Sequence, residues 1–341
     1  MNVEDELQAT IAKMVQPGKG ILAADESLPT IAKRFKAINL ESTAENRRAY
    51  RSLLFTTPGA DEFISGVILF EETLAQAADD GTLLPEALAR QGIVPGVKVD
   101  KGKIPLAHAP GDEVTQGLDG LAERLRTYRA QGARFAKWRE VYPIGAQNPT
   151  QLGIEANAEM LARYAAVCQE EGFVPIVEPE VLIDGDHTLE RCLDVTGTVL
   201  HAVFHALHRH RVVLEYTVLK PSMVLPGKKH PPKATPEQVA AATVKVLRRT
   251  VPAAVPSINF LSGGQGPEEA TTNLNAMNAL FPNVPWELSF SYGRALQEPI
   301  LLAWTGKKEN AQAAQQAFYQ RAKLNGLARR GKYSVELEKG S

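Results

Sequence analysis

The chain of 341 residues is long enough for one large domain or two ordinary ones, and its 44% hydrophobic and 23% charged residues are typical of a globular protein. Its 38 basic and 39 acidic residues give a formal net charge of −1, which argues against nucleic acid or an anionic membrane as the main partner. Two cysteines without metal-ligand spacing, no apolar run long enough to span a bilayer and an acidic start without a signal peptide predict a cytoplasmic protein with reduced thiols.

A rhythm of short apolar runs, polar turns and longer helix-like stretches recurs along the chain. The expected strands are residues 20–26, 65–70, 93–99, 133–139, 174–180, 212–220, 257–264 and 286–293. The helical patterns between them include residues 120–131, 154–171, 189–209 and 236–249. Strands that alternate with helices and are apolar throughout indicate an α/β protein with a parallel sheet covered on both faces.

Eight such units predict a closed (β/α)8 barrel that forms one domain over residues 1–341, with an N-terminal helical extension and a C-terminal extension. Residues 334–341 are expected to be a flexible tail. An open, doubly wound sheet is the alternative, which is weakened because no GxGxxG follows the first expected strand.

Nearly every expected strand ends in an ionisable or glycine-rich element. These are Asp25-Glu26, Glu71-Glu72, Lys98, Lys137 and Arg139, Glu178 and Glu180, Lys220, Ser262-Gly263-Gly264, and Gly293-Arg294. One such charge usually meets only solvent, but the reactive face of a barrel is built where its strands end, so we expect these groups to converge there.

Lys220 closes the most apolar expected strand and precedes Pro221. Desolvation and a neighbouring cation such as Lys137 would lower its pKa and make it a nucleophile near neutral pH. The alternative is a lysine whose ammonium only reaches water.

Glu178 and Glu180 are two residues apart in an extended segment and should share the barrel mouth. Two crowded carboxylates do not both ionise easily, so one of them is expected to be a proton donor near pH 7. The alternative is that the pair only neutralises Lys137 and Arg139.

Two further patterns suggest ligand sites. The glycine-rich turn at Ser262, Gly263 and Gly264 could close on an anion together with Arg294, although such a turn is more often only a turn. His201 and His205 have the i,i+4 spacing of a metal site but no HExxH pattern, so a helix face is the better interpretation.

Long motifs then identify a resemblance. GKGILAADES, VDKG, TQGLDGLAER, FAKWR, IVEPE, LKPSMV, FLSGGQ and FSYGRALQ resemble, in order and spacing, class I fructose-1,6-bisphosphate aldolases from about Gly18 to about Tyr333. The resemblance implies a (β/α)8 barrel, usually a homotetramer, that cleaves fructose 1,6-bisphosphate through a lysine Schiff base. It implies no metal and no cofactor, because the iminium serves as the electron sink.

The resemblance also implies roles for individual residues. Lys220 matches the Schiff-base lysine, Glu178 the general acid/base with Glu180 beside it, Asp25 the base for the C4 hydroxyl, and Lys137 the assisting cation with Arg139 nearby. Residues that match the ketone-side phosphate site are Ser262, Gly263, Gly264, Ser291, Gly293 and Arg294. Residues similar to those at the other phosphate or along the sugar are Ser27, Lys101 and Arg34.

Two departures from the family pattern concern substrate choice and proton transfer. Residues 28–31 read LPTI where the family is GSIAKR-like, which leaves the choice among bisphosphate, monophosphate and longer sugars open. The C-terminal sequence ELEKGS has no terminal tyrosine, so proton transfer assisted by such a tail is not carried over. The alternatives to an aldolase are a transaldolase-like transferase or dehydratase on the same scaffold, and a non-enzymatic scaffold that binds protein partners.

Overall fold

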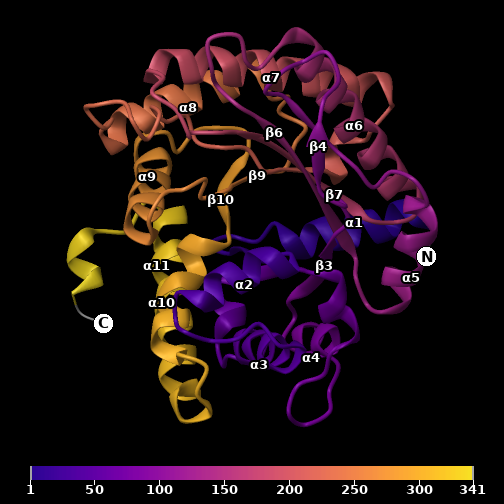
Figure 1. Cartoon of the computed structure of the whole chain (residues 1–341), viewed down its shortest axis with the longest axis vertical. Coiled ribbons are helices and arrows are strands. Elements are labelled where there is room, and N and C mark those ends of the chain that lie inside the picture. Colours follow the sequence, from indigo (N-terminus) through magenta and orange to yellow (C-terminus); the bar gives the residue numbers. More distant parts are fainter. Residues whose placement is uncertain (1, 340–341) are drawn as a thin grey trace.

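A computed structural model describes residues 2–339, and these residues contain a closed barrel of eight parallel strands (Figure 1). The strands are β1 (Gly20–Ala24), β2 (Ile64–Leu69), β3 (Val94–Lys98), β6 (Phe135–Tyr142), β7 (Val174–Val181), β8 (Val218–Leu219), β9 (Ser257–Phe260) and β10 (Glu287–Tyr292). They neighbour each other in chain order, and β10 pairs with β1 to close the ring. The predicted (β/α)8 barrel is therefore confirmed.

Helices surround the strands on all sides in Figure 1. They are α1 (Val3–Met14), α2 (Leu28–Lys36), α3 (Ala44–Phe55), α4 (Leu84–Arg90), α5 (Leu121–Ala130), α6 (Gln151–Glu170), α7 (Leu189–Arg209), α8 (Pro236–Thr250), α9 (Pro267–Leu280), α10 (Arg294–Trp304) and α11 (Ala311–Arg329). A continuous cluster of buried apolar side chains fills the space between strands and helices. Among the described residues, none of these helices combines the length and apolarity needed to cross a membrane.

Helix α1 closes the amino-terminal end of the barrel. Leu7, Ile11 and Met14 follow one face of the helix and are buried in a second cluster with residues that point into the barrel, such as Ile21 and Phe135. A capping box between Asn2 and Asp5 starts the helix. This end of the barrel is therefore packed with apolar side chains, and the polar strand ends lie at the other end.

The sixth expected strand is much shorter than the pattern over residues 212–220 predicted. Leu214–Tyr216 forms a 3₁₀ turn, and only Val218–Leu219 pairs in the sheet. The Gln169 side chain of α6 accepts from the Val213 N–H (2.9 Å) and donates to the Val213 carbonyl (2.7 Å). These bonds satisfy the backbone at Val213 in place of a strand ladder.

A small antiparallel hairpin, β4 (Lys103–Pro105) and β5 (Glu113–Thr115), stands between β3 and β6 and was not expected from the sequence. Its strands are only three residues long, and β4 is exposed throughout, so it carries no apolar periodicity.

The end of the described chain contacts α11. Residues Val335–Glu338 form a 3₁₀ turn, and Glu338 pairs with the buried Arg321 at 2.8 Å and accepts from the Tyr333 hydroxyl at 2.8 Å. Residues 340–341 lie outside the described residues. The flexibility expected for residues 334–341 stays a prediction.

The barrel interior has no room for a side chain at Gly96, so a substitution there tests how tightly the interior is packed. A Cβ on Gly96 would overlap the ring carbons of the buried Phe135, its partner on β6. We expect Gly96→Ala to lower the free energy of unfolding by about 1–3 kcal/mol in a denaturant titration, because the packed ring has no room to retreat. Gly266→Ala is the control, since a Cβ there meets nothing within 4 Å. Equal loss of stability in both variants would contradict this description of the interior.

Candidate active site

A cavity of about 660 Å³ opens at the carboxyl end of the strands. Its lining includes every residue that the sequence suggested for the site: Asp25, Ser27, Arg34, Lys101, Lys137, Arg139, Glu178, Glu180, Lys220, Ser262, Gly263, Gly264, Ser291, Gly293 and Arg294. The strand-end groups therefore converge, as expected for a barrel, with the exception of Glu72, which forms an ion pair with Arg47 of α3 and does not line the cavity.

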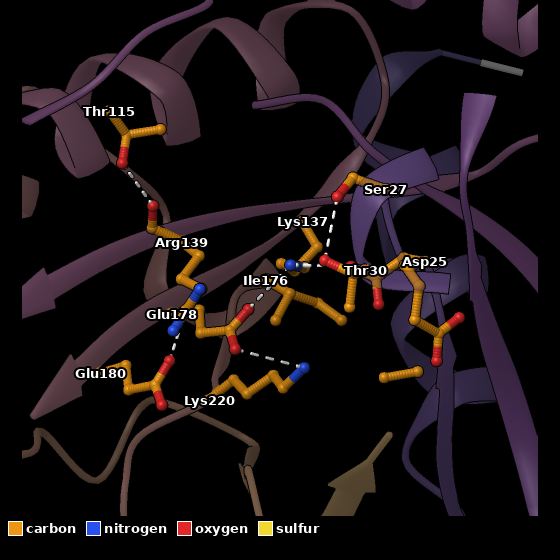
Figure 2. A network of polar contacts seen from close by, with 12 residues as sticks. Asp25, Ser27, Thr30, Thr115, Lys137, Arg139, Ile176, Glu178, Glu180 and Lys220 are labelled. Atoms are coloured by element: carbon orange, nitrogen blue, oxygen red, sulfur yellow. Dashed lines mark hydrogen bonds and ion pairs between the residues drawn. The ribbon is translucent and has the colours of Figure 1, made fainter. Parts of the chain in front are cut away.

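Lys137 is the centre of a buried cluster of charges (Figure 2). Its ammonium lies 2.8 Å from Asp25 on the β1 side and 3.1 Å from Glu178 on β7. The other oxygen of Glu178 lies 3.4 Å from the amine of Lys220, which follows β8. Neighbouring strand ends thus carry an alternating row of cation and carboxylate.

The charges in this row support each other. Burial alone would raise the pKa of Asp25, but the Lys137 and Lys220 ammoniums and Lys98 hold it well below its usual range. Burial alone would lower the pKa of Lys137, but Asp25 and Glu178 raise it well above its usual range. Asp25 is therefore ionised and Lys137 protonated over the whole physiological pH range.

Lys220 differs from Lys137, because the pKa of Lys220 is lowered. Burial is the main cause and the Lys137 ammonium adds to it, whereas Glu178 opposes the shift. The same two causes were expected from the sequence, and a lowered pKa supplies the neutral amine that a nucleophile needs.

The reason given for a proton donor at Glu178 and Glu180 was wrong. Burial would raise the pKa of Glu178, but Lys137, Lys220 and Arg139 outweigh burial and lower it. Glu180 is turned toward the Arg139 guanidinium and forms an ion pair with it (Figure 2). The two carboxylates therefore have separate cation partners, and Glu178 is ionised in the free protein.

The turn after β9 has the geometry of an anion site. Gly263 (φ 48°) and Gly264 (φ 86°) occupy the left-handed region that favours glycine, and their turn leads into the start of α9, where the helix dipole stabilises an anion. Ser291 and Arg294, at the end of β10 and the start of α10, line the same part of the cavity. The buried Ser291 hydroxyl has no hydrogen-bond partner within residues 2–339, so it is free to bind a ligand there.

A second polar region lines the cavity on the side opposite the turn after β9. Lys101 follows β3, which is opposite β9 in the ring, and its ammonium lies 2.6 Å from Glu71. Ser27 precedes α2 and its hydroxyl contacts that of Thr30 at 3.0 Å, while Arg34 of α2 forms an ion pair with Glu26.

Sequence reasoning did not assign a role to several residues of the lining. Lys98, Asp100 and Lys103 line the cavity, and the buried Glu26 joins Arg34 to Arg51 of α3, 2.6 Å away. Lys98 and Glu26 stood among the strand-end groups, which was a usable signal. Arg51, which is buried behind Glu26, had no signal, because nothing in the sequence shows which helical arginine contacts this carboxylate.

The histidine pair lies away from this cavity. His201 and His205 are exposed on α7. Within residues 2–339, no three His, Cys, Asp or Glu side chains are grouped so that they could hold a metal ion.

The fold and the cavity define a class: a (β/α)8-barrel enzyme with a buried, reactive lysine between two polar regions of its mouth. The family model of class-I fructose-bisphosphate aldolase matches residues 6–341, and the chain belongs to this family.

Relatives share most of its length. Fructose-bisphosphate aldolase 4, cytosolic, from Arabidopsis thaliana is 56% identical and covers 98% of this chain, which spans 85% of that relative. The fructose-bisphosphate aldolase of Dictyostelium discoideum is 57% identical, with coverage of 99% and 95%. A solved structure of fructose-bisphosphate aldolase from Plasmodium falciparum, in complex with TRAP and a small molecule inhibitor, is similar with a TM-score of 0.96 and 53% identity, with coverage of 97% and 96%.

The charge row predicts how Lys220 responds to loss of its neighbour. Lys137→Met removes a cation that lowers the pKa of Lys220 and leaves Glu178 to stabilise the Lys220 ammonium alone, so both effects raise that pKa. We expect the pH at which Lys220 reacts with a small aldehyde and cyanoborohydride to move upward by about one unit or more. Peptide mass mapping of the labelled protein at a series of pH values measures this shift. An unchanged or lower midpoint would contradict the arrangement.

Proposed function

We propose that Lys220 forms a Schiff base with the ketone of fructose 1,6-bisphosphate and that the chain cleaves this sugar reversibly into dihydroxyacetone phosphate and glyceraldehyde 3-phosphate. The observation that carries the proposal is the position of Lys220. Its buried amine of lowered pKa lies 3.4 Å from Glu178, on the wall between two polar regions that lie across the mouth from each other. Membership of the class-I aldolase family supports the same reaction.

The first half of the reaction forms the iminium. The neutral Lys220 amine adds to the C2 carbonyl, and loss of water from the carbinolamine gives a cationic iminium. Glu178 and Lys137 are the groups near enough to move these protons, with Glu178 within reach of both amines. Because Glu178 is ionised at the start, it acts first as a base and donates a proton only after it has accepted one.

The second half breaks the carbon–carbon bond. The Asp25 carboxylate takes the proton of the C4 hydroxyl, the C3–C4 electron pair moves into the iminium, and the aldehyde triose phosphate leaves. The remaining enamine is protonated at C3, and water hydrolyses the iminium to release the ketone product. Asp25 suits this step because Lys137, 2.8 Å away, keeps it ionised.

The two phosphates are assigned to the two polar regions. The turn Ser262–Gly264 with Ser291, Gly293 and Arg294 would hold the ketone-side phosphate, through backbone N–H groups, hydroxyls and a guanidinium. Ser27, Arg34 and Lys101 would hold the other phosphate or the sugar hydroxyls, and Arg139 lines the same cavity. The ring order supports a substrate that spans the mouth, since β3 and β9 are opposite each other.

Activity of lysine variants tests the proposal. Lys220→Met should lower kcat for fructose 1,6-bisphosphate cleavage by several orders of magnitude, because the pKa of the neighbouring Lys137 is raised and its protonated amine cannot replace the nucleophile. Lys229→Met, which removes an exposed lysine on the loop after β8, is the matched control and should keep wild-type activity. Triose phosphate release is measured in buffer with EDTA. Wild-type protein that is folded but inactive, or a Lys220→Met variant that stays active, would refute the proposal.

The assembly and location are proposed on family grounds. A homotetramer is the assembly that the aldolase resemblance implies, and sedimentation equilibrium would measure its mass. A cytoplasmic location is supported by the names of plant relatives that are called cytosolic or cytoplasmic, and cell fractionation would test it.

A further inference from the structure

Glu140 is a buried carboxylate that takes no part in the reaction described above. It follows Arg139 on β6 and does not line the cavity, whereas Lys137 and Arg139 do, as the alternation of side chains along a strand requires. Its side chain is fully buried. One oxygen accepts from the Trp138 indole N–H at 2.7 Å, and the other accepts from the Thr115 backbone N–H at 3.1 Å.

The second of these bonds joins the catalytic strand to the β4–β5 hairpin. The Thr115 hydroxyl adds a bond to the Arg139 carbonyl at 2.8 Å. Next to Thr115, the Gln116 carbonyl accepts from the Lys101 N–H at 2.8 Å, and the Gln116 N–H donates to the Gly102 carbonyl at 2.8 Å. The position of Lys101 therefore depends on the position of Thr115.

The hairpin carries cations into the cavity. Lys101, Gly102 and Lys103 all belong to the cavity lining. The far end of the hairpin is fastened separately, since the buried Asp112 accepts from the Thr150 N–H and hydroxyl at the start of α6. At the base, next to Lys101, two side chains join the hairpin to β6: the Glu140 carboxylate accepts from the Thr115 N–H, and the Thr115 hydroxyl donates to the Arg139 carbonyl.

We propose that Glu140 is a positioning residue that holds the base of the hairpin, and with it Lys101, in place for the phosphate remote from the ketone, and thereby favours sugar bisphosphates over monophosphates. This inference rests on the proposed function and deepens it. The ketone-side phosphate lies across the mouth, so a ketose 1-phosphate does not need the hairpin.

The ionised form of Glu140 fits this task. An ionised carboxylate accepts a hydrogen bond at each oxygen, but a protonated one has a hydrogen on one oxygen and accepts poorly there. Burial raises the pKa of Glu140 to about 7, with a small contribution from Asp100, and the bonds from Trp138 and Thr115 oppose the rise. Tyr142 of the same strand is also close enough to be affected by the Glu140 charge, and it stays neutral because burial raises its pKa. The hairpin should therefore be held less firmly below pH 7 than above it.

Glu140→Gln tests the proposal. The amide has one oxygen and one NH₂ group, so its NH₂ must point at the N–H of either Trp138 or Thr115, and that hydrogen bond is lost. Trp138 is fully buried, so we expect the bond to Thr115 to be the one that is lost and the hairpin to move. We expect KM for fructose 1,6-bisphosphate to rise by about tenfold, since a hydrogen bond to a charged group is lost, while KM for fructose 1-phosphate and kcat for both change less than about twofold. Glu155→Gln makes the same chemical change at an exposed carboxylate of α6, so it is the matched control and should leave the preference nearly unchanged.

Two further readouts separate positioning from a general structural effect. The KM of the wild-type protein for the bisphosphate should increase, relative to that of Glu140→Gln, as pH falls through 7. Lys101→Met should also raise this KM, and combining it with Glu140→Gln should add little, because both changes act on the same contact. If Glu140→Gln does not fold, Glu140→Asp replaces it, since the shorter carboxylate does not reach both donors and should raise the same KM.

Each other outcome overturns the inference. Equal changes of KM for both substrates, or additive effects of Glu140→Gln and Lys101→Met, would show that Glu140 does not act through the hairpin. A wild-type protein that cleaves neither substrate would instead refute the proposed function.

Discussion

The site depends on the Lys137 ammonium between two carboxylates. An isolated charge in this position would be expelled or neutralised, because burial penalises every ion in the cluster. Asp25 at 2.8 Å and Glu178 at 3.1 Å keep Lys137 charged, and Lys137 keeps both of them ionised. The same charge disfavours a proton on Lys220, so one cation prepares both the base and the nucleophile.

The barrel makes this arrangement possible because adjacent strands deliver side chains to one end at fixed intervals. Lys137, Glu178 and Lys220 come from β6, β7 and β8, which are consecutive in the ring, and Asp25 reaches the cluster from β1 across the mouth. Helix α1 fills the opposite end with apolar side chains, so the polar cavity opens in one direction only. The residues of β6 that point outward have a different task, since Glu140 ties the strand to a hairpin that carries further cations.

Much of this could be predicted from the sequence, because the signals were local. Apolar runs marked the barrel strands, and an ionisable residue at the end of a run is visible without a structure. Long aldolase-like motifs assigned roles that strand ends alone would have left open. Two features that the sequence did not reveal depend on contacts distant in the chain. Gln169 bonds the backbone of Val213, which therefore does not join the sheet, and Arg51 of α3 forms an ion pair with Glu26. The hairpin was missed for a different reason, because its strands are too short and polar to show a hydrophobic period.

The charge state of Glu178 is the most instructive error. Its spacing from Glu180 suggested two crowded carboxylates, and spacing along a strand is readable from sequence. The pairing of Glu178 with Lys137 and Lys220, and of Glu180 with Arg139, depends on neighbouring strands and their register. The sign of the pKa shift follows from those partners.

Borohydride trapping is the most direct test of a nucleophilic Lys220. The protein is incubated with fructose 1,6-bisphosphate and EDTA, reduced with borohydride and mapped by peptide mass spectrometry. A stable adduct on Lys220, with Lys137 unmodified, is the predicted result. An adduct on Lys137, or no adduct from protein that is folded and active, would contradict the mechanism.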